Sequence, residues 1–259
     1  MSAIFSLQGK VAIVTGSGRS KGIGAAIAAL LALHGAAVVV NFLSPATASQ
    51  AEGVVRGIAQ QGGQAVAVQA DISTEAGVQA LVDAAVELGG KIDIIVNNAV
   101  AGSSGPALQA SLETIQYTFA VNVAGPVLLI KAAVAHMPPR SRIINIGSIA
   151  SRIGGPGSAL YGASKAAMDA LTYSMAWELG RDHGGITINT VAPGPVDTES
   201  LPAPVAAKIH GALIPMTRVE ERVGTVQEIA DAVLLLCSEK SRWISGQCIS
   251  VSGGITGGV

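Results

Sequence analysis

The chain has 259 residues, of which 49% are hydrophobic and only 13% charged, and its 16 basic and 17 acidic residues leave a net charge of −1. This length suits one α/β domain, and the hydrophobic content excludes an intrinsically disordered chain. Because there is no basic excess to neutralise phosphates, nucleic acid is not an expected partner.

The N-terminal segment MSAIFSLQGK lacks the basic start and long apolar stretch of a secretory leader. The apolar run 25–40 is interrupted by His34 and Gly35, and it is shorter than the roughly 20 residues that span a bilayer. Two cysteines and four scattered histidines provide neither a disulfide framework nor a metal site. We therefore expect a cytoplasmic protein with no membrane span and no metal.

Strand and helix patterns alternate along the whole chain. Continuous apolar runs, typical of strands buried on both faces of a parallel sheet, occur at 11–15, 36–40, 65–70, 92–96, 143–146, 187–191 and 248–251. Helical patterns lie between them at 24–34, 47–61, 75–88, 112–137, 159–179 and 226–236. The alternation predicts a single α/β domain over residues 1–259, a Rossmann-like doubly wound fold with a seven-stranded parallel sheet flanked by helices.

The segment 199–224 interrupts this alternation, because it contains three prolines and no predicted strand. It is long enough to be an insertion that covers a site. Its Leu, Ile and Met side chains favour an apolar or cyclic substrate, or else they only hold the segment against the domain. We interpret residues 199–224 as a substrate lid.

A glycine cluster, TGSGRSKGIG, joins the first predicted strand to the first helix. Glycines allow a tight turn and a close approach of the backbone to a pyrophosphate, which the free N–H groups of the helix N-terminus can bind. Either Gly16 or Gly18 could be the first glycine of such a loop, and a plain glycine-rich turn is the alternative.

Polar or small residues also follow the other predicted strands. Ligands of an open parallel sheet bind outside the carboxyl ends of its strands, and the residues at these ends are Thr15, Gly16, Asn41, Asp71, Asn97, Ser148 and Pro193. Tyr161 and Lys165 are four residues apart in a helical pattern and so share one face. An ammonium beside a phenol is expected to lower the tyrosine pKa.

Taken together, TG…GIG, Asn97-Asn98-Ala99, Ser148, Tyr161-Gly162-Ala163-Ser164-Lys165 and Pro193-Gly194 resemble the classical short-chain dehydrogenase/reductase family over essentially the whole chain. The resemblance implies that Tyr161 protonates a carbonyl oxygen as hydride reaches the carbon, while Ser148 hydrogen-bonds that oxygen. It also implies that Lys165 tunes Tyr161 and binds the nicotinamide ribose, and that Asn122 holds a proton-relaying water.

The resemblance further implies the cofactor contacts. Asp71 and Ile72 would contact adenine, Asn97 and Ala99 its ribose, and Pro193, Gly194, Val196 and Thr198 the carboxamide end. Asp71 could instead cap the next helix. Two departures from the family pattern stand out: five residues rather than three separate TG from GIG, and Val100 replaces a glycine.

The glycine loop and the second strand bear on which dinucleotide binds. NAD sites usually place an acid after the second strand, where this chain has Asn41. The loop supplies Arg19, Ser20 and Lys21 before Gly22 and Ile23, similar to the Ser-Arg pair of NADPH-preferring members. We predict NADP(H), with solvated loop cations as the alternative.

The leading hypothesis is an NADPH-dependent carbonyl reductase, or alcohol dehydrogenase in reverse, acting on a small-molecule ketone or secondary alcohol. The alternatives are a non-redox isomerase, dehydratase or cyclase that retains the cofactor, and a nucleotide-sensing protein without catalysis. The resemblance and the sparse charge also imply a homotetramer with contacts through helices 112–137 and 159–179 and the last strand.

Overall fold

Seven parallel strands form one sheet in the computed structural model, which describes residues 3–102, 105–199 and 203–256. The strands are β1 (Val11–Val14), β2 (Ala37–Phe42), β3 (Gln64–Gln69), β4 (Ile94–Asn97), β5 (Arg142–Ile146), β6 (Thr187–Pro193) and β7 (Cys248–Val251). They lie in the order β3-β2-β1-β4-β5-β6-β7, with every neighbouring pair parallel. The predicted strands and the Rossmann-like doubly wound fold are therefore confirmed.

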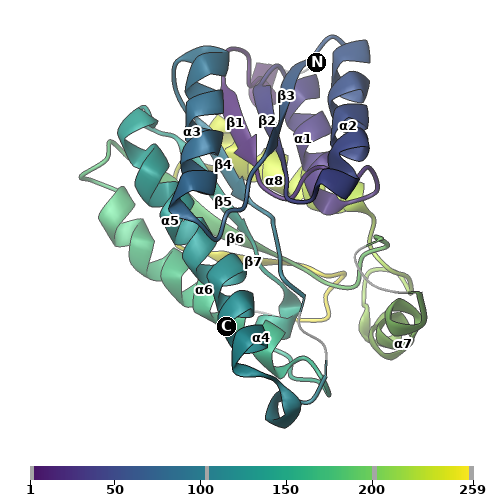
Figure 1. Ribbon diagram of the computed structural model, residues 1–259. Coiled ribbons are helices and arrows are strands. Elements are labelled where there is room, and N and C mark those ends of the chain that lie inside the picture. The colour runs from purple at the N-terminus through teal and green to yellow at the C-terminus, as the bar shows by residue number, and fades with distance from the viewer. Residues whose placement is uncertain (1–2, 103–104, 200–202, 257–259) are drawn as a thin grey trace.

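Helices cover both faces of this sheet (Figure 1). One face carries α1 (Ile23–Leu33), α2 (Ala48–Gln60) and α8 (Val226–Cys237), and the other carries α3 (Glu75–Gly89), α5 (Gly125–Ala133) and α6 (Ala159–Leu179). From β1 the chain adds β2 and then β3 on one side of the sheet. It then crosses to the other side of β1, where β4 to β7 follow in order, so the strand order reverses between β1 and β4. Such a reversal opens a crevice at the carboxyl ends of the strands, which is where ligands bind in this class of fold.

The continuous apolar runs are explained by two separate cores. In β1, Ala12 and Val14 pack with α1 and α8, whereas Val11 and Ile13 pack with α3 and α5. Successive side chains of a strand point to opposite faces, so a sheet covered on both sides buries all of them. The sheet is thus a rigid base, and its edge is free to carry polar groups.

The long helix predicted over residues 112–137 is interrupted. It consists of α4 (Leu112–Phe119), a π-helical segment (Ala120–Ala124), α5 and a short 3₁₀ turn. Pro126 lacks an N–H and cannot donate to the carbonyl of Asn122, and the N–H of Gly125 bonds to Ala120 in the wider π pattern. The interruption therefore lies at Asn122, a predicted site residue.

Within the described residues, the run Leu112–His136 is the one stretch long and apolar enough to cross a membrane by length and composition. Its Leu129, Ile130 and Ala133 are buried in the core that also contains α3. These contacts identify it as a core helix.

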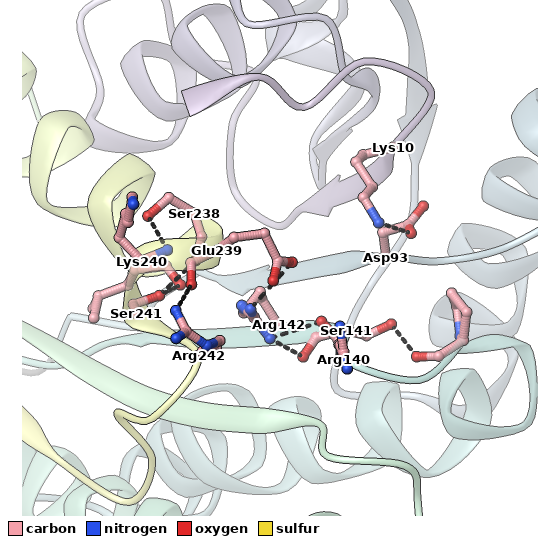
Figure 2. A network of polar contacts seen from close by, with 12 residues as sticks. Lys10, Asp93, Arg140, Ser141, Arg142, Ser238, Glu239, Lys240, Ser241 and Arg242 are labelled. Atoms are coloured by element: carbon pink, nitrogen blue, oxygen red, sulfur yellow. Dashed lines mark hydrogen bonds and ion pairs between the residues drawn. The ribbon is translucent and has the colours of Figure 1, made fainter. Parts of the chain in front are cut away.

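The amino ends of the strands carry a polar network away from the crevice (Figure 2). The buried Asp93 carboxylate accepts from Lys10 Nζ at 3.0 Å and from the Val11 N–H at 2.9 Å, and it pairs with Lys91 at 3.1 Å. Nearby, the buried guanidinium of Arg142 reaches Glu239 at 3.5 Å. The Asp93 contacts join the start of β1 to the start of β4, and the Arg142 contact joins β5 to the turn after α8, at the edge opposite the candidate site.

Replacing Asp93 by alanine is expected to lower the free energy of unfolding by about 1–3 kcal/mol, because the Val11 N–H loses its buried acceptor. The two lysines are partly exposed and can turn to water, so they add little to this loss. Urea unfolding measures the effect, with the exposed Asp83→Ala as the control. Equal stability of the two variants would show that Asp93 does not hold β1 in place.

Candidate functional site

The glycine loop between β1 and α1 is a tight turn with no room for side chains at two positions. Gly16 has φ +62°, and a Cβ there would come within 2.7 Å of the Ala99 backbone. A Cβ on Gly18 would lie 2.7 Å from the Cβ of Phe42. Both glycines are thus required: Gly16 takes the left-handed turn, and Gly18 lets the longer loop cross β2.

Hydrogen bonds from beneath hold this loop in place. The Oδ1 of Asn41 accepts from the Gly16 N–H at 3.0 Å, and its Nδ2 donates to the Ala70 carbonyl at 3.0 Å. Asn98 donates to the carbonyls of Thr15 and Gly16. Asn41 lies within β2 rather than after it, and it is only 2% exposed. Its amide therefore supports the loop from the inside. Asn98 was not among the predicted site residues, although its place beside Asn97 was a signal.

The outer part of the loop presents its cations to solvent. Arg19, Ser20 and Lys21 are exposed, and Lys21 Nζ pairs with Glu199 Oε1 at 3.1 Å. The N-cap of α1 is Gly22, which has no side chain to accept hydrogen bonds from the first N–H groups of the helix. Uncapped N–H groups at a helix start, next to exposed cations, form a cradle suited to an anion.

The carboxyl ends of β3 and β4 place the predicted adenine-side residues. Asp71 accepts from the N–H and hydroxyl of Ser73, and Thr74 caps α3, so the alternative of Asp71 as the helix cap is wrong. Ile72 is buried, with its side chain close to Gly125. Ala99 donates its N–H to Thr15 Oγ1 at 3.0 Å.

Asn97 carries a polar atom that its neighbours leave unpaired. Its Nδ2 donates to Asn145 at 2.8 Å, while its Oδ1 is buried and has no hydrogen-bond partner in the described part of the chain. A buried acceptor without a donor is costly unless a bound group supplies one.

The segment after β6 returns against the sheet edge. The Gly194 N–H donates to Val251, and Val196 forms a parallel bridge with Gly224, the last residue of the predicted lid. Pro193 ends β6, and Thr198 is half-buried beyond it. These residues therefore lie between the sheet edge and the segment 199–224.

The predicted lid contains a helix that the sequence analysis did not predict, α7 (Ala203–Leu213), followed by a 3₁₀ turn. Pro204 lies in the first turn of α7, where a proline costs no helical hydrogen bond. Residues 200–202 lie outside the described part of the chain. No described residue of α7 is buried, and the helix stands away from the sheet in Figure 1.

Ser148, Tyr161 and Lys165 come together at the carboxyl end of β5. Ser148 caps the turn after this strand, and its side chain hydrogen-bonds that of Tyr161. Lys165 Nζ lies 5.7 Å from the centre of the Tyr161 ring and donates to the Ile146 carbonyl at 2.7 Å. Asn122 is joined to this group, because it donates to Ser164 Oγ at 3.0 Å from the π-helical segment.

Burial dominates the protonation of these groups. It raises the pKa of Tyr161 above its usual value, and the hydrogen bond with Ser148 lowers that pKa by less. The net shift is upward in spite of Lys165, whose ammonium lies over the ring and donates its hydrogen bond to the backbone. Burial also lowers the pKa of Lys165 to about 8, against the opposing charge of Asp169. At neutral pH, Tyr161 therefore holds its proton.

Comparisons with known proteins identify the family of this chain. A family model described as enoyl-(acyl carrier protein) reductase matches residues 16–256. The short-chain dehydrogenase/reductase FrzI of Cladobotryum is 41% identical, with 96% of this chain and 97% of that protein covered. A probable tetrahydroxynaphthalene reductase of Zymoseptoria tritici is 38% identical over 95% of this chain and 94% of its own.

A solved short-chain dehydrogenase of Burkholderia cenocepacia, in complex with NADP, superposes with a TM-score of 0.88. It is 37% identical, and the match covers 96% of this chain and 98% of that one. Both the sequence and the fold lead to the same assignment: this chain is an oxidoreductase of the short-chain dehydrogenase/reductase family.

Proposed function

We propose that the chain is an NADPH-dependent carbonyl reductase, and in reverse an alcohol dehydrogenase, for an apolar or cyclic ketone or secondary alcohol. The observation that carries the proposal is the meeting of the Tyr161 hydroxyl, the Ser148 hydroxyl and the Lys165 side chain at the carboxyl end of β5. A protonated phenol at this position is ready to donate to a carbonyl oxygen.

Several features support NADP(H) as the cofactor. The uncapped start of α1 and the exposed Arg19 and Lys21 favour phosphate groups, and Asn41 leaves no carboxylate to repel a 2′-phosphate. The unpaired Oδ1 of Asn97 could accept a ribose hydroxyl. The cofactor residues are proposed to be Gly16, Gly18, Arg19, Ser20, Lys21, Gly22, Ile23, Asp71, Ile72, Asn97, Ala99, Tyr161, Lys165, Pro193, Gly194, Val196 and Thr198, whereas Asn41 supports the loop from beneath. When bound, the nicotinamide supplies or takes up hydride.

The side chains of the site divide the remaining work. Ser148 hydrogen-bonds the substrate oxygen and fixes its distance from Tyr161, which donates the proton. Lys165 stabilises the charge that develops on Tyr161 and binds the nicotinamide ribose. Asn122 would hold the relaying water at its backbone carbonyl, since its side-chain amide is engaged with Ala101 and Ser164.

Substrate choice is assigned to the lid, residues 199–224 of the single domain 1–259. Its described apolar side chains are at least partly exposed, among them Ile209, Leu213 and Met216. Such a surface suits an apolar ring system, and a relative named for tetrahydroxynaphthalene supports a cyclic substrate.

A panel of cyclic and open-chain ketones with NADPH tests the proposal. Consumption of NADPH, followed by the absorbance of the reduced nicotinamide, is expected with cyclic ketones. Product without nicotinamide turnover would instead indicate an isomerase, dehydratase or cyclase. Cofactor binding without any product would indicate a nucleotide sensor.

We also propose a cytoplasmic homotetramer, since both cysteines are free thiols and large apolar side chains remain exposed. Tyr173 and Trp177 on α6 are 61% and 77% exposed and lie one helical turn apart. A second apolar face surrounds a cavity of about 350 Å³ between α8 and β7, lined in part by Leu235 and Ile244. Two distinct faces are what a tetramer with two-fold axes needs.

The substitution Trp177→Asp is expected to halve the assembly, because a charge in the centre of an apolar contact between copies is left without a partner. Sedimentation equilibrium at micromolar concentration measures the change. Val219→Asp, at an exposed apolar residue after α7, is the control and should leave the tetramer intact. A wild-type monomer, or a Trp177→Asp tetramer, would contradict the proposed interface.

A further inference from the structure

Asp169 lies one helical turn after Lys165 on α6, facing the same end of β5. Its Oδ1 is buried and has no hydrogen-bond partner in the described part of the chain. This oxygen lies 3.4 Å from where a Cβ on Gly147 would be. Gly147 directly follows Ile146, whose carbonyl accepts the hydrogen bond from Lys165 Nζ. The carboxylate and the ammonium therefore approach the same short piece of backbone.

The charged and titratable groups around this pair are few. Tyr161 precedes Lys165 on α6, Cys248 of β7 hydrogen-bonds Asp169, and the exposed Arg152 also acts on Cys248. The pKa of Cys248 is raised to about 11, first by burial and then by the charge of Asp169, so the thiol is neutral at working pH. Asp169 is thus the anion that opposes the loss of the lysine proton on burial.

We propose that Asp169 is a positioning residue for Lys165, whose carboxylate keeps the buried lysine charged over the pH range in which Tyr161 donates its proton. The role in proton donation rests on the proposed reductase function. The effect of Asp169 on the charge of Lys165 does not depend on that function. A carboxylate oxygen left without hydrogen bonds in a buried setting is costly, and its attraction to a nearby ammonium offsets that cost.

The test is a direct titration of Lys165 in the cofactor-free protein. Lysine labelled with ¹³C at Cε gives a resonance for each lysine, and Lys165→Arg identifies the one from Lys165. The midpoint is expected near pH 8 in the wild type and lower by about one pH unit or more in Asp169→Asn. Asp169→Glu should restore most of the difference, and the exposed Asp231→Asn on α8 should leave the midpoint unchanged.

A midpoint in Asp169→Asn equal to that of the wild type would overturn the inference. If the amide variant does not fold, as judged by circular dichroism, Asp169→Ser removes the same charge and gives the same test. In kinetics, the alkaline fall of kcat for ketone reduction should move down in pH by the same amount. If the midpoint moves but neither protein reduces ketones, the proposed function fails while the inference on Asp169 stands.

Discussion

Replacing Tyr161 by phenylalanine is expected to lower kcat for ketone reduction by at least about a hundredfold while leaving NADPH affinity within a few-fold of the wild type. The substitution removes one oxygen atom and keeps the ring over Lys165, so the packing of α6 is preserved. The lost hydroxyl is the group that hydrogen-bonds Ser148 and would donate the proton.

Steady-state rates and fluorescence titration of bound NADPH measure the two quantities separately. Tyr173→Phe is the matched control, since it removes a hydroxyl from the same helix at a residue that is mostly exposed. Because burial raises the pKa of Tyr161, alcohol oxidation, which needs the phenolate, should also increase with pH in the wild type and not in Tyr161→Phe. A Tyr161→Phe enzyme with near wild-type kcat would show that another group donates the proton.

The fold was predictable because the inner strands β1, β4, β5 and β6 are buried on both faces. Runs such as Val11–Val14 contain no polar residue, which is typical of a buried strand. The alternation of such strands with helices then indicates an α/β fold with a parallel sheet. The position of the site followed from the same topology, since the carboxyl ends of parallel strands share one edge. Ser148 and Tyr161 could therefore be placed together from the sequence, although thirteen positions separate them in the numbering.

The unpredicted features depend on contacts that a one-dimensional pattern does not contain. To predict the π-helical segment, one must know which carbonyl Pro126 leaves without a donor. The helix α7 was missed because it begins near two prolines, which in a sequence indicate a loop. The raised pKa of Tyr161 reflects burial by distant elements rather than the nearby Lys165. Asn41, expected to contact the cofactor, proved to be buried under the loop, because β2 continues past the predicted strand end.

The paired substitution Arg19→Ala and Lys21→Ala is expected to lower the ratio of kcat/KM for NADPH over NADH by roughly ten- to a hundredfold. A single charge-assisted hydrogen bond contributes about 1.5–3 kcal/mol, which is the expected range, and only NADPH carries the 2′-phosphate that would accept it. Activity with NADH should change little, because in the proposed binding mode backbone N–H groups at the start of α1 hold the pyrophosphate.

Lys21 must leave Glu199 to bind that phosphate, and the cost of doing so decides how large the effect is. Both partners of the pair are more than half exposed, so the pair is worth under about 1 kcal/mol, less than one bond to a phosphate. Glu199→Gln should therefore raise the NADPH preference slightly, opposite in sign to the double variant. Lys131→Ala, at an exposed lysine on α5, should leave the ratio unchanged. An unaltered ratio in the double variant would mean that the loop cations are only solvated, and the cofactor preference would then have to come from elsewhere in the site.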